Sequence, residues 1–150
     1  MEENKEIVNL LYQYLVDVKK VVKDLKLESK VDKEGLSWIG ELPKSGKIEE
    51  KGIAYQFHGV GCLVEWQNKS IDFDFNFRYE QYDSVFGIDT WFAAYYLESL
   101  KLPQYSKLDE NESRVRAVLD KLVKQGQIIK EEHYYYFKED YELLQESKEE

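Results

Sequence analysis

The chain has 150 residues and a formal net charge of -9, with a sequence pI of about 4.9. Its 43% of hydrophobic and 15% of aromatic residues are typical of one globular domain with a buried core. The negative charge argues against nucleic acids and anionic membranes as partners, because both require basic surfaces. It suits a cationic partner instead.

The cellular location is predicted from the cysteine count and the N-terminus. The single cysteine, Cys62, cannot form an internal disulfide, which fits a reducing compartment. The chain begins MEENKEIVNL, without the basic start and apolar run of a signal peptide, and it has no apolar stretch long enough to span a bilayer. We therefore expect a cytoplasmic protein.

The first 51 residues are predicted to form a helix and a loop. Residues 3–27 place apolar side chains three and four positions apart, which predicts an amphipathic helix that covers the core. Residues 28–51 are charged and rich in turn residues, so we expect a long loop. Trp38, Ile39 and Leu42 are expected to pin this loop to the core.

Residues 52–77 have the pattern of three antiparallel strands joined by two-residue turns at 59–60 and 68–69. In this register every member of three cross-strand rows is apolar, so one face of the sheet belongs to the core. Cys62 lies on that face, as a small buried hydrophobe. The three apolar rows are Phe57-Cys62-Phe75, Tyr55-Val64-Phe73 and Ile53-Trp66-Ile71.

The opposite face of this predicted sheet carries the candidate functional residues. Its rows are Ala54-Glu65-Asp72, Gln56-Leu63-Asp74 and His58-Gly61-Asn76. Glu65 and Asp72 would face each other, and like charges across strands are destabilising. Solvent, a nearby Lys or Arg, a cation of a partner protein or a divalent metal would compensate them. His58 has space above Gly61 to approach Asn76 or Asp74, as a turn-stabilising residue or as an acid–base group.

Two helices are predicted after the sheet. Residues 89–101 form the first, with Asp89 as its N-cap. Residues 110–125 form the second, and Asp109 with Glu112 resembles a capping box at its start. Both patterns are typical of helices that pack on a sheet.

The C-terminal part is predicted to be a hairpin with an acidic tail. Gly126 ends the preceding helix, and the next residues alternate on both sides of a turn near 131–132. A helix followed by a hairpin resembles the end of a winged helix, but residues 103–138 hold seven basic and six acidic side chains, which argues against DNA binding. Tyr134 to Tyr136 are expected to be exposed, as contact residues for a protein partner.

Known catalytic motifs do not occur in the sequence. It contains no phosphate-binding glycine loop, no GxSxG, no HExxH and no paired-cysteine zinc pattern. Cys62 and His58 lie on opposite faces of neighbouring strands, which weakens a nucleophile–base pair. We therefore predict no catalytic residue, no cofactor and no bound metal.

Three motifs together resemble a family of uncharacterised bacterial domains. They are HGVGC at 58–62, IDFDF at 71–75 and FGIDTWF at 86–92, and the resemblance covers about residues 36–100. It implies kinship with small cytoplasmic proteins that resemble immunity proteins of polymorphic toxin systems, without catalytic activity. Asn76 replaces the glycine that such proteins carry after the second Asp-Phe, so we expect a different turn there.

The sequence thus predicts a single α+β domain over residues 1–150. An antiparallel meander over about 52–77 packs against the N-terminal helix and the two later helices, and a second hairpin follows near the C-terminus.

The first functional hypothesis is a non-catalytic cytoplasmic protein of the immunity type. It would bind and neutralise a cognate, basic toxin through an acidic surface. The acidic C-terminal residues are one candidate surface, because residues 131–150 carry a net charge of -6. The other candidate surface consists of His58, Glu65, Asp72, Asp74 and Asn76.

The alternative hypothesis is a small hydrolase or a metal-dependent enzyme that uses His58 with Asp72 and Asp74. On sheet spacing, the Cα atoms of His58 and Asp74 would lie roughly 10–12 Å apart. That separation is unfavourable for direct contact, so the binding protein is the better reading.

Overall fold

The computed structural model describes residues 2–26, 28–32, 35–39, 42–58, 61–74, 78–79, 84–85 and 87–142. The helices are α1 (Glu2–Asp24), α2 (Thr90–Ser99) and α3 (Leu108–Lys124), with 3-10 turns η1 (Glu49–Lys51) and η2 (Pro103–Tyr105). The strands are β1 (Glu28–Asp32), β2 (Gly35–Ile39), β3 (Ser45–Ile48), β4 (Ile53–His58), β5 (Gly61–Trp66), β6 (Lys69–Asp74), β7 (Arg78–Tyr79), β8 (Ser84–Val85), β9 (Ile128–Glu131) and β10 (Tyr134–Phe137).

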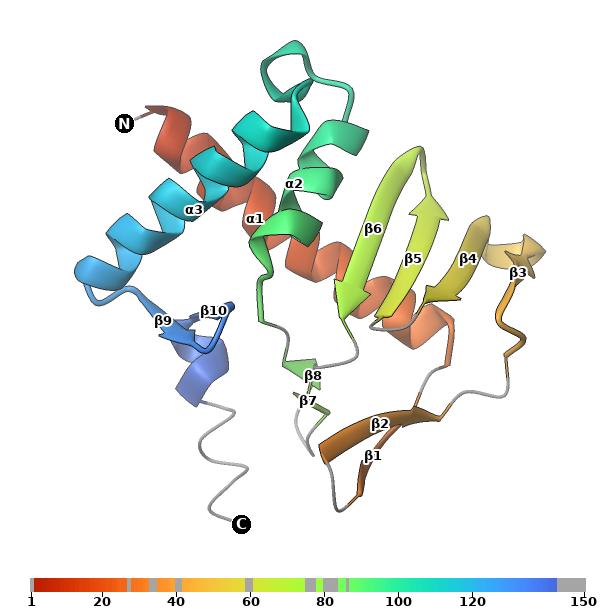
Figure 1. Cartoon of the computed structure of the whole chain (residues 1–150). Coiled ribbons are helices and arrows are strands. Elements are labelled where there is room, and N and C mark those ends of the chain that lie inside the picture. Colours follow the sequence, from red (N-terminus) through yellow and green to blue (C-terminus); the bar gives the residue numbers. More distant parts are fainter. Residues whose placement is uncertain are drawn as a thin grey trace.

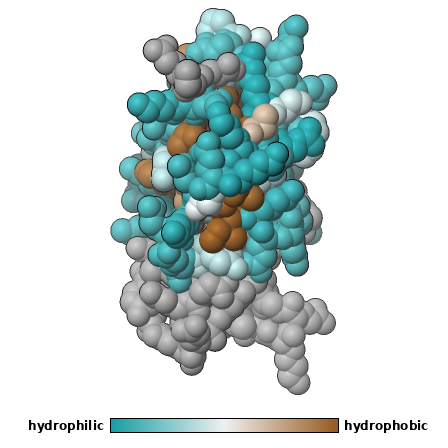
Figure 2. Space-filling model, turned by 90° about the vertical axis from the view of Figure 1, so that its left-hand side faces the viewer, coloured by the Kyte–Doolittle hydropathy of each residue, from teal (hydrophilic) through white to brown (hydrophobic). Residues whose placement is uncertain are grey.

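These elements confirm the predicted α+β fold. A four-stranded antiparallel sheet has the order β3-β4-β5-β6, and the described strands also form the two-stranded pairs β1-β2, β7-β8 and β9-β10. The long helix α1 runs behind the four-stranded sheet, while α2 lies beside β6 (Figure 1). The side of the molecule that carries α3 is largely hydrophilic, with a few hydrophobic side chains showing between hydrophilic ones (Figure 2).

Helix α1 is amphipathic, as predicted, and its apolar stripe covers the inner face of the sheet. Each such buried side chain contributes roughly 1.5–3 kcal/mol before the loss of conformational entropy is counted. The buried apolar residues of this stripe are Ile7, Leu11, Tyr14, Leu15, Val18, Val21, Val22 and Leu25.

The register of the sheet agrees with the prediction between β4 and β5, where Phe57 pairs with Cys62. Between β5 and β6 it is two residues off, because Cys62 pairs with Phe73 and not with Phe75. The turn lies at Gln67-Asn68, where both residues adopt positive φ values of 51° and 63°, the requirement of a tight hairpin turn. A slip of two residues keeps every side chain on its face, so the predicted core face is correct.

Residues 28–51 are not the long loop that the sequence predicted. The described residues of this range form the β1-β2 pair, the edge strand β3 and the turn η1. Strand β3 pairs with the open edge of β4 through backbone groups, which a side-chain pattern does not reveal. Leu42 packs against the core as expected, whereas the side chains of Trp38 and Ile39 lie outside the described part.

The N-termini of α2 and α3 are built differently. Asp89 caps α2 as predicted, because its carboxylate accepts hydrogen bonds from the backbone N–H groups of Trp91 at 2.9 Å and Phe92 at 3.3 Å. The capping box at α3 is wrong: the N-cap is Lys107, without a side-chain cap. Glu112 is buried instead and accepts a hydrogen bond from the hydroxyl of Thr90 at 3.2 Å.

Helix α3 is terminated by Gly126, as predicted. Gly126 has a φ of 76°, and its N–H donates to the carbonyl of Val123 at 3.0 Å. The N–H of Gln127 donates to the carbonyl of Leu122 at 2.9 Å. These two hydrogen bonds form a Schellman motif, which gives partners to two carbonyl groups at the end of the helix.

The β9-β10 hairpin turns one residue later than predicted, at 132–133, and β10 is buried throughout. The expectation that Tyr134 to Tyr136 are exposed is therefore wrong. Tyr134 and Tyr136 pack closely on Gly87, where a Cβ atom would lie 2.7 Å from Cβ of Tyr134 and 2.8 Å from Cζ of Tyr136, whereas Tyr135 belongs to the main core. The absence of a side chain lets the hairpin close over this segment, and the hydroxyl of Tyr135 donates to Asp120 at 2.6 Å.

Candidate functional site

Three of the predicted site residues have described side chains, and all three lie on the outer face of the four-stranded sheet: His58, Glu65 and Asp72. Glu65 pairs with Ser70 and not with Asp72, so the predicted opposition of two carboxylates is wrong. The turn at Gln67-Asn68 causes this, because it moves β6 by two residues along β5. The side chain of Asp74 and the whole of Asn76 lie outside the described part of the chain.

His58 and Asp72 form a direct pair on this face. Nε2 of His58 lies 2.8 Å from Oδ1 of Asp72, and the two residues belong to β4 and β6, on either side of β5. Gly61, the β5 partner of His58, has no side chain to separate them. An ionised carboxylate only accepts hydrogen bonds, so Nε2 is the donor. The hydrogen-bond partner of His58 is thus Asp72, whereas the sequence predicted Asp74 or Asn76.

The environment of this pair is partly aromatic. The side chain of His58 is 33% exposed and that of Asp72 is 16% exposed. The imidazole stands edge-on to the ring of Phe92 in α2, with 6.3 Å between ring centroids. The pair therefore joins the outer sheet face to α2.

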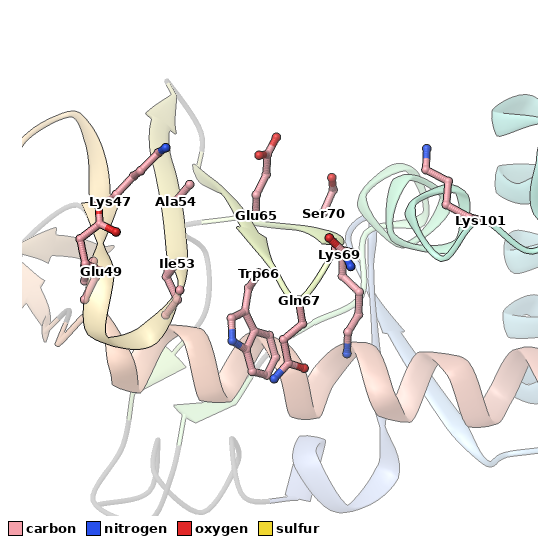
Figure 3. A pocket seen from close by; sticks show the side chains of 13 residues that line it. Lys47, Glu49, Ile53, Ala54, Glu65, Trp66, Gln67, Lys69, Ser70 and Lys101 are labelled. Carbon is pink, nitrogen blue, oxygen red and sulfur yellow. The ribbon is translucent and has the colours of Figure 1, made fainter.

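A broad hollow of about 830 Å³ lies on the outer face and bends around the β5-β6 turn. Lys47, Glu65, Ser70 and Lys101 point to the side of the sheet away from α1, whereas Trp66 and Lys69 point toward α1 (Figure 3). Glu65 is exposed and shares the hollow with Lys47 and Lys101. The charges in this hollow are of both signs, so a lysine does lie near Glu65, one of the compensating charges that the sequence left open.

Cys62 lies on the inner face and is fully buried, with 0% exposure. Burial raises the pKa of its thiol to about 12, and the nearby charge of Asp72 adds to the shift. A thiol with this pKa stays protonated at neutral pH, and the thiolate is the nucleophilic form. Cys62 is therefore a core residue, as the register predicted.

A second polar cluster, which sequence reasoning missed, lies between the sheet and two helices. Asp17 of α1 is 2% exposed. Its Oδ2 accepts hydrogen bonds from Nζ of Lys69 at 2.8 Å and from the hydroxyl of Tyr96 at 2.8 Å. Its Oδ1 accepts from Nε2 of Gln13 at 2.9 Å.

This cluster ties α1, α2 and β6 together. Desolvation by burial, followed by the hydrogen bond to Asp17, raises the pKa of Tyr96 above its ordinary value. The sequence did hold a signal, because Asp17 stands three residues after Tyr14 and four before Val21, within the apolar stripe of α1. A carboxylate in that position requires partners from the elements it packs on.

The described residues were compared with the requirements of a metal site and of a membrane-spanning helix. Among the described residues, no three side chains of His, Cys, Asp or Glu converge to hold a metal ion. None of the described helices is long and apolar enough to cross a membrane.

Comparison with known protein families identifies the class of this α+β domain. The family described as "Domain of unknown function (DUF6896)" matches residues 7–143. The chain belongs to this family, and the match covers most of α1, all of α2 and α3, the four-stranded sheet and the C-terminal hairpin. Curated proteins and solved structures give no significant match.

Proposed function

We propose that this protein is a non-catalytic binding protein of the immunity type, which neutralises a cognate toxin by direct contact. The observation that carries the proposal is the outer sheet face, where a broad hollow of about 830 Å³ lies among polar and charged side chains. The motif resemblance to immunity-like proteins and the net charge of -9 support a basic protein as the partner. The cytoplasm is the proposed location.

The contact surface in this proposal centres on Glu65. Glu65 is exposed on the outer face, and it lines the same hollow as Lys47 and Lys101. A partner that meets this face encounters charges of both signs, so its orientation would be fixed by their pattern. The proposal also includes Asp74 and Asn76, which stand in the sequence at the end of β6 and two residues after it.

The alternative, a small hydrolase or metal-dependent enzyme, rests on the bond of 2.8 Å between His58 and Asp72. A carboxylate that orients an imidazole is half of a catalytic arrangement, but a nucleophile or a bound water must complete it. Cys62 is on the opposite face with a pKa of about 12, so it does not complete the arrangement. The binding role therefore has the stronger support.

The test is co-expression with the product of the neighbouring gene in a bacterial host. We expect the chain to relieve the toxicity of that product and to form a complex of micromolar or higher affinity, measured by calorimetry. Absence of both rescue and binding would contradict the proposal. Hydrolase activity lost in His58→Ala would favour the alternative.

The surface itself is tested by a matched pair of charge reversals. Glu65→Lys should weaken the complex by about tenfold, which corresponds to about 1.4 kcal/mol. Glu110→Lys is the control, because Glu110 is exposed on α3 and its pair with Lys107 is solvent-exposed, so it adds little to stability. Equal effects of both reversals would show that net charge, and not the outer face, governs binding.

A further inference from the structure

A groove on another side of the molecule is lined by apolar residues from three elements. It has a volume of about 340 Å³ and lies between the first half of α1, the second half of α3 and the β9-β10 hairpin. Figure 2 shows hydrophobic side chains surrounded by hydrophilic ones on the side of the molecule that carries α3. The apolar lining residues are Val8, Tyr12, Val118, Leu122, Ile128 and Phe137.

The floor of the groove consists of buried side chains, and its upper side is open to solvent. Val118, Ile128 and Phe137 are buried, whereas Tyr12 is 45% exposed. The ring of Tyr12 stacks on that of Phe137 with 4.0 Å between centroids. The α1 wall runs from residue 4 to residue 12, which is roughly 12 Å or two helical turns. An open trough of this length suits a helix better than a small molecule, whose sites enclose most of the ligand.

The charges around the groove are opposite to those of the protein as a whole. The chain has a net charge of -9, yet the charged residues that line the groove are two lysines, Lys5 and Lys121. They stand on opposite walls, one on α1 and one on α3. At the Tyr12 end, burial raises the pKa of the Tyr12 hydroxyl, and the charges of Glu139 and Asp140 raise it further. The groove therefore has a basic rim, whereas near its Tyr12 end lie Glu139 and Asp140, the second of which forms an ion pair with Lys19 at 3.8 Å.

We propose that this groove binds an acidic amphipathic helix of a partner protein. Its apolar side chains would lie between α1 and α3, with its carboxylates toward Lys5 and Lys121 and away from Glu139 and Asp140. Helix-in-groove recognition uses apolar anchors at i, i+3 or i+4 and i+7, which the two turns of the α1 wall accommodate. The inference is independent of the toxin-binding role and concerns a different surface.

The test uses two designed, fluorescein-labelled helical peptides of about 14 residues, about 21 Å long. Both carry leucines at i, i+3 and i+7; one has glutamates and the other lysines at the flanking positions. Fluorescence anisotropy with the full chain should show binding of the glutamate peptide and weaker binding of the lysine peptide. Failure of the glutamate peptide to bind at concentrations up to 1 mM, or equal affinity for both peptides, overturns the proposal.

Variants of the groove separate its apolar and charged parts. Leu122→Glu should reduce binding of the glutamate peptide by more than tenfold. Because Leu122 also packs against the core, Asn9→Glu serves as the second variant, since Asn9 is exposed and lines the groove. Circular dichroism melting must show that Asn9→Glu is folded, and unchanged binding in it would overturn the proposal.

The role of the rim is tested by neutralising the lysines. The double variant Lys5→Gln with Lys121→Gln should lower the affinity for the glutamate peptide by between about twofold and about thirtyfold, as expected for two solvent-exposed charge pairs. The matched control is Lys23→Gln with Lys44→Gln, which removes two exposed lysines that line neither this groove nor the outer-face hollow. If the control weakens binding as much as the rim variant, attraction to net charge explains the binding and the groove proposal is wrong.

Discussion

The two faces of the four-stranded sheet use the same strands for opposite purposes. On the inner face, Cys62 and Phe73 pair and are buried against α1. On the outer face, one residue away along β6, Asp72 bonds to His58 and is in partial contact with solvent. The alternation of side chains along a strand makes this division. Residues that are adjacent in sequence therefore differ in how strongly a substitution should affect folding.

The largest expected effect comes from adjacent residues of β6. Phe73→Ala should lower the free energy of unfolding by about 3–5 kcal/mol, because it leaves a cavity in the core. Asp72→Ala, its neighbour on the outer face, should cost about 1 kcal/mol through the lost hydrogen bond to His58. Urea denaturation measures both values. Similar losses for the two variants would contradict the division between the faces.

The next effect concerns the buried carboxylate behind the sheet. Asp17→Ala should destabilise the protein by about 3 kcal/mol, because Lys69 and Tyr96 lose their acceptor in a buried site. Glu65→Ala on the outer face is the control, and we expect a change below about 0.5 kcal/mol. Thermal denaturation of the two variants compares them. A mild effect of Asp17→Ala would mean that water replaces the missing carboxylate.

A pH effect of intermediate size is expected from the inner face. The pKa of Cys62 is raised to about 12 in the folded protein, so above its ordinary pKa the thiol ionises in the unfolded chain but not in the folded one. Stability contributed by this group is therefore complete below pH 9 and is lost as pH rises. The loss is on the order of 2 kcal/mol between pH 9 and pH 10.5.

The pH effect is checked with Cys62→Ala. Urea denaturation at both pH values should show a smaller decrease in stability for this variant than for the unchanged chain. Part of the decrease will remain, because burial also raises the pKa of Tyr96 and Tyr135. Identical decreases in both proteins would assign the effect to the tyrosines alone.

The smallest effect should come from the outer-face pair. A double-mutant cycle of His58→Ala and Asp72→Ala should give a coupling energy of about 0.5–1.5 kcal/mol at neutral pH, since both side chains are partly exposed. The matched cycle of His58→Ala and Glu65→Ala should show almost no coupling. Strong coupling in the second cycle would indicate that the outer face acts as one connected network.

Much of the sheet was predictable because β-strand patterns have a period of two. The apolar rows placed Cys62 in the core, and they did so correctly although the turn at Gln67-Asn68 shifts β6 by two residues. The same period of two explains why one contact across the sheet was not predicted. A two-residue shift does not move a side chain to the other face, but it changes its neighbours, so the His58–Asp72 pair was not predicted.

Residues far apart in sequence account for the other differences. Asp17 meets Lys69 and Tyr96 only after α1, β6 and α2 have packed together, and Tyr134 and Tyr136 pack on the segment at Gly87 because that residue has no side chain. No local pattern contains these distances. They follow from how complete elements pack.

The sequence by itself determined which side chains share a face of α1 and of each strand, where α2 begins and where α3 ends, since these depend on periodicity and on single residues such as Asp89 and Gly126. Only the tertiary structure decided which residues touch across elements. It paired His58 with Asp72, enclosed the carboxylate of Asp17 and formed the groove between α1 and α3, because contact between distant segments depends on the packing of the whole chain.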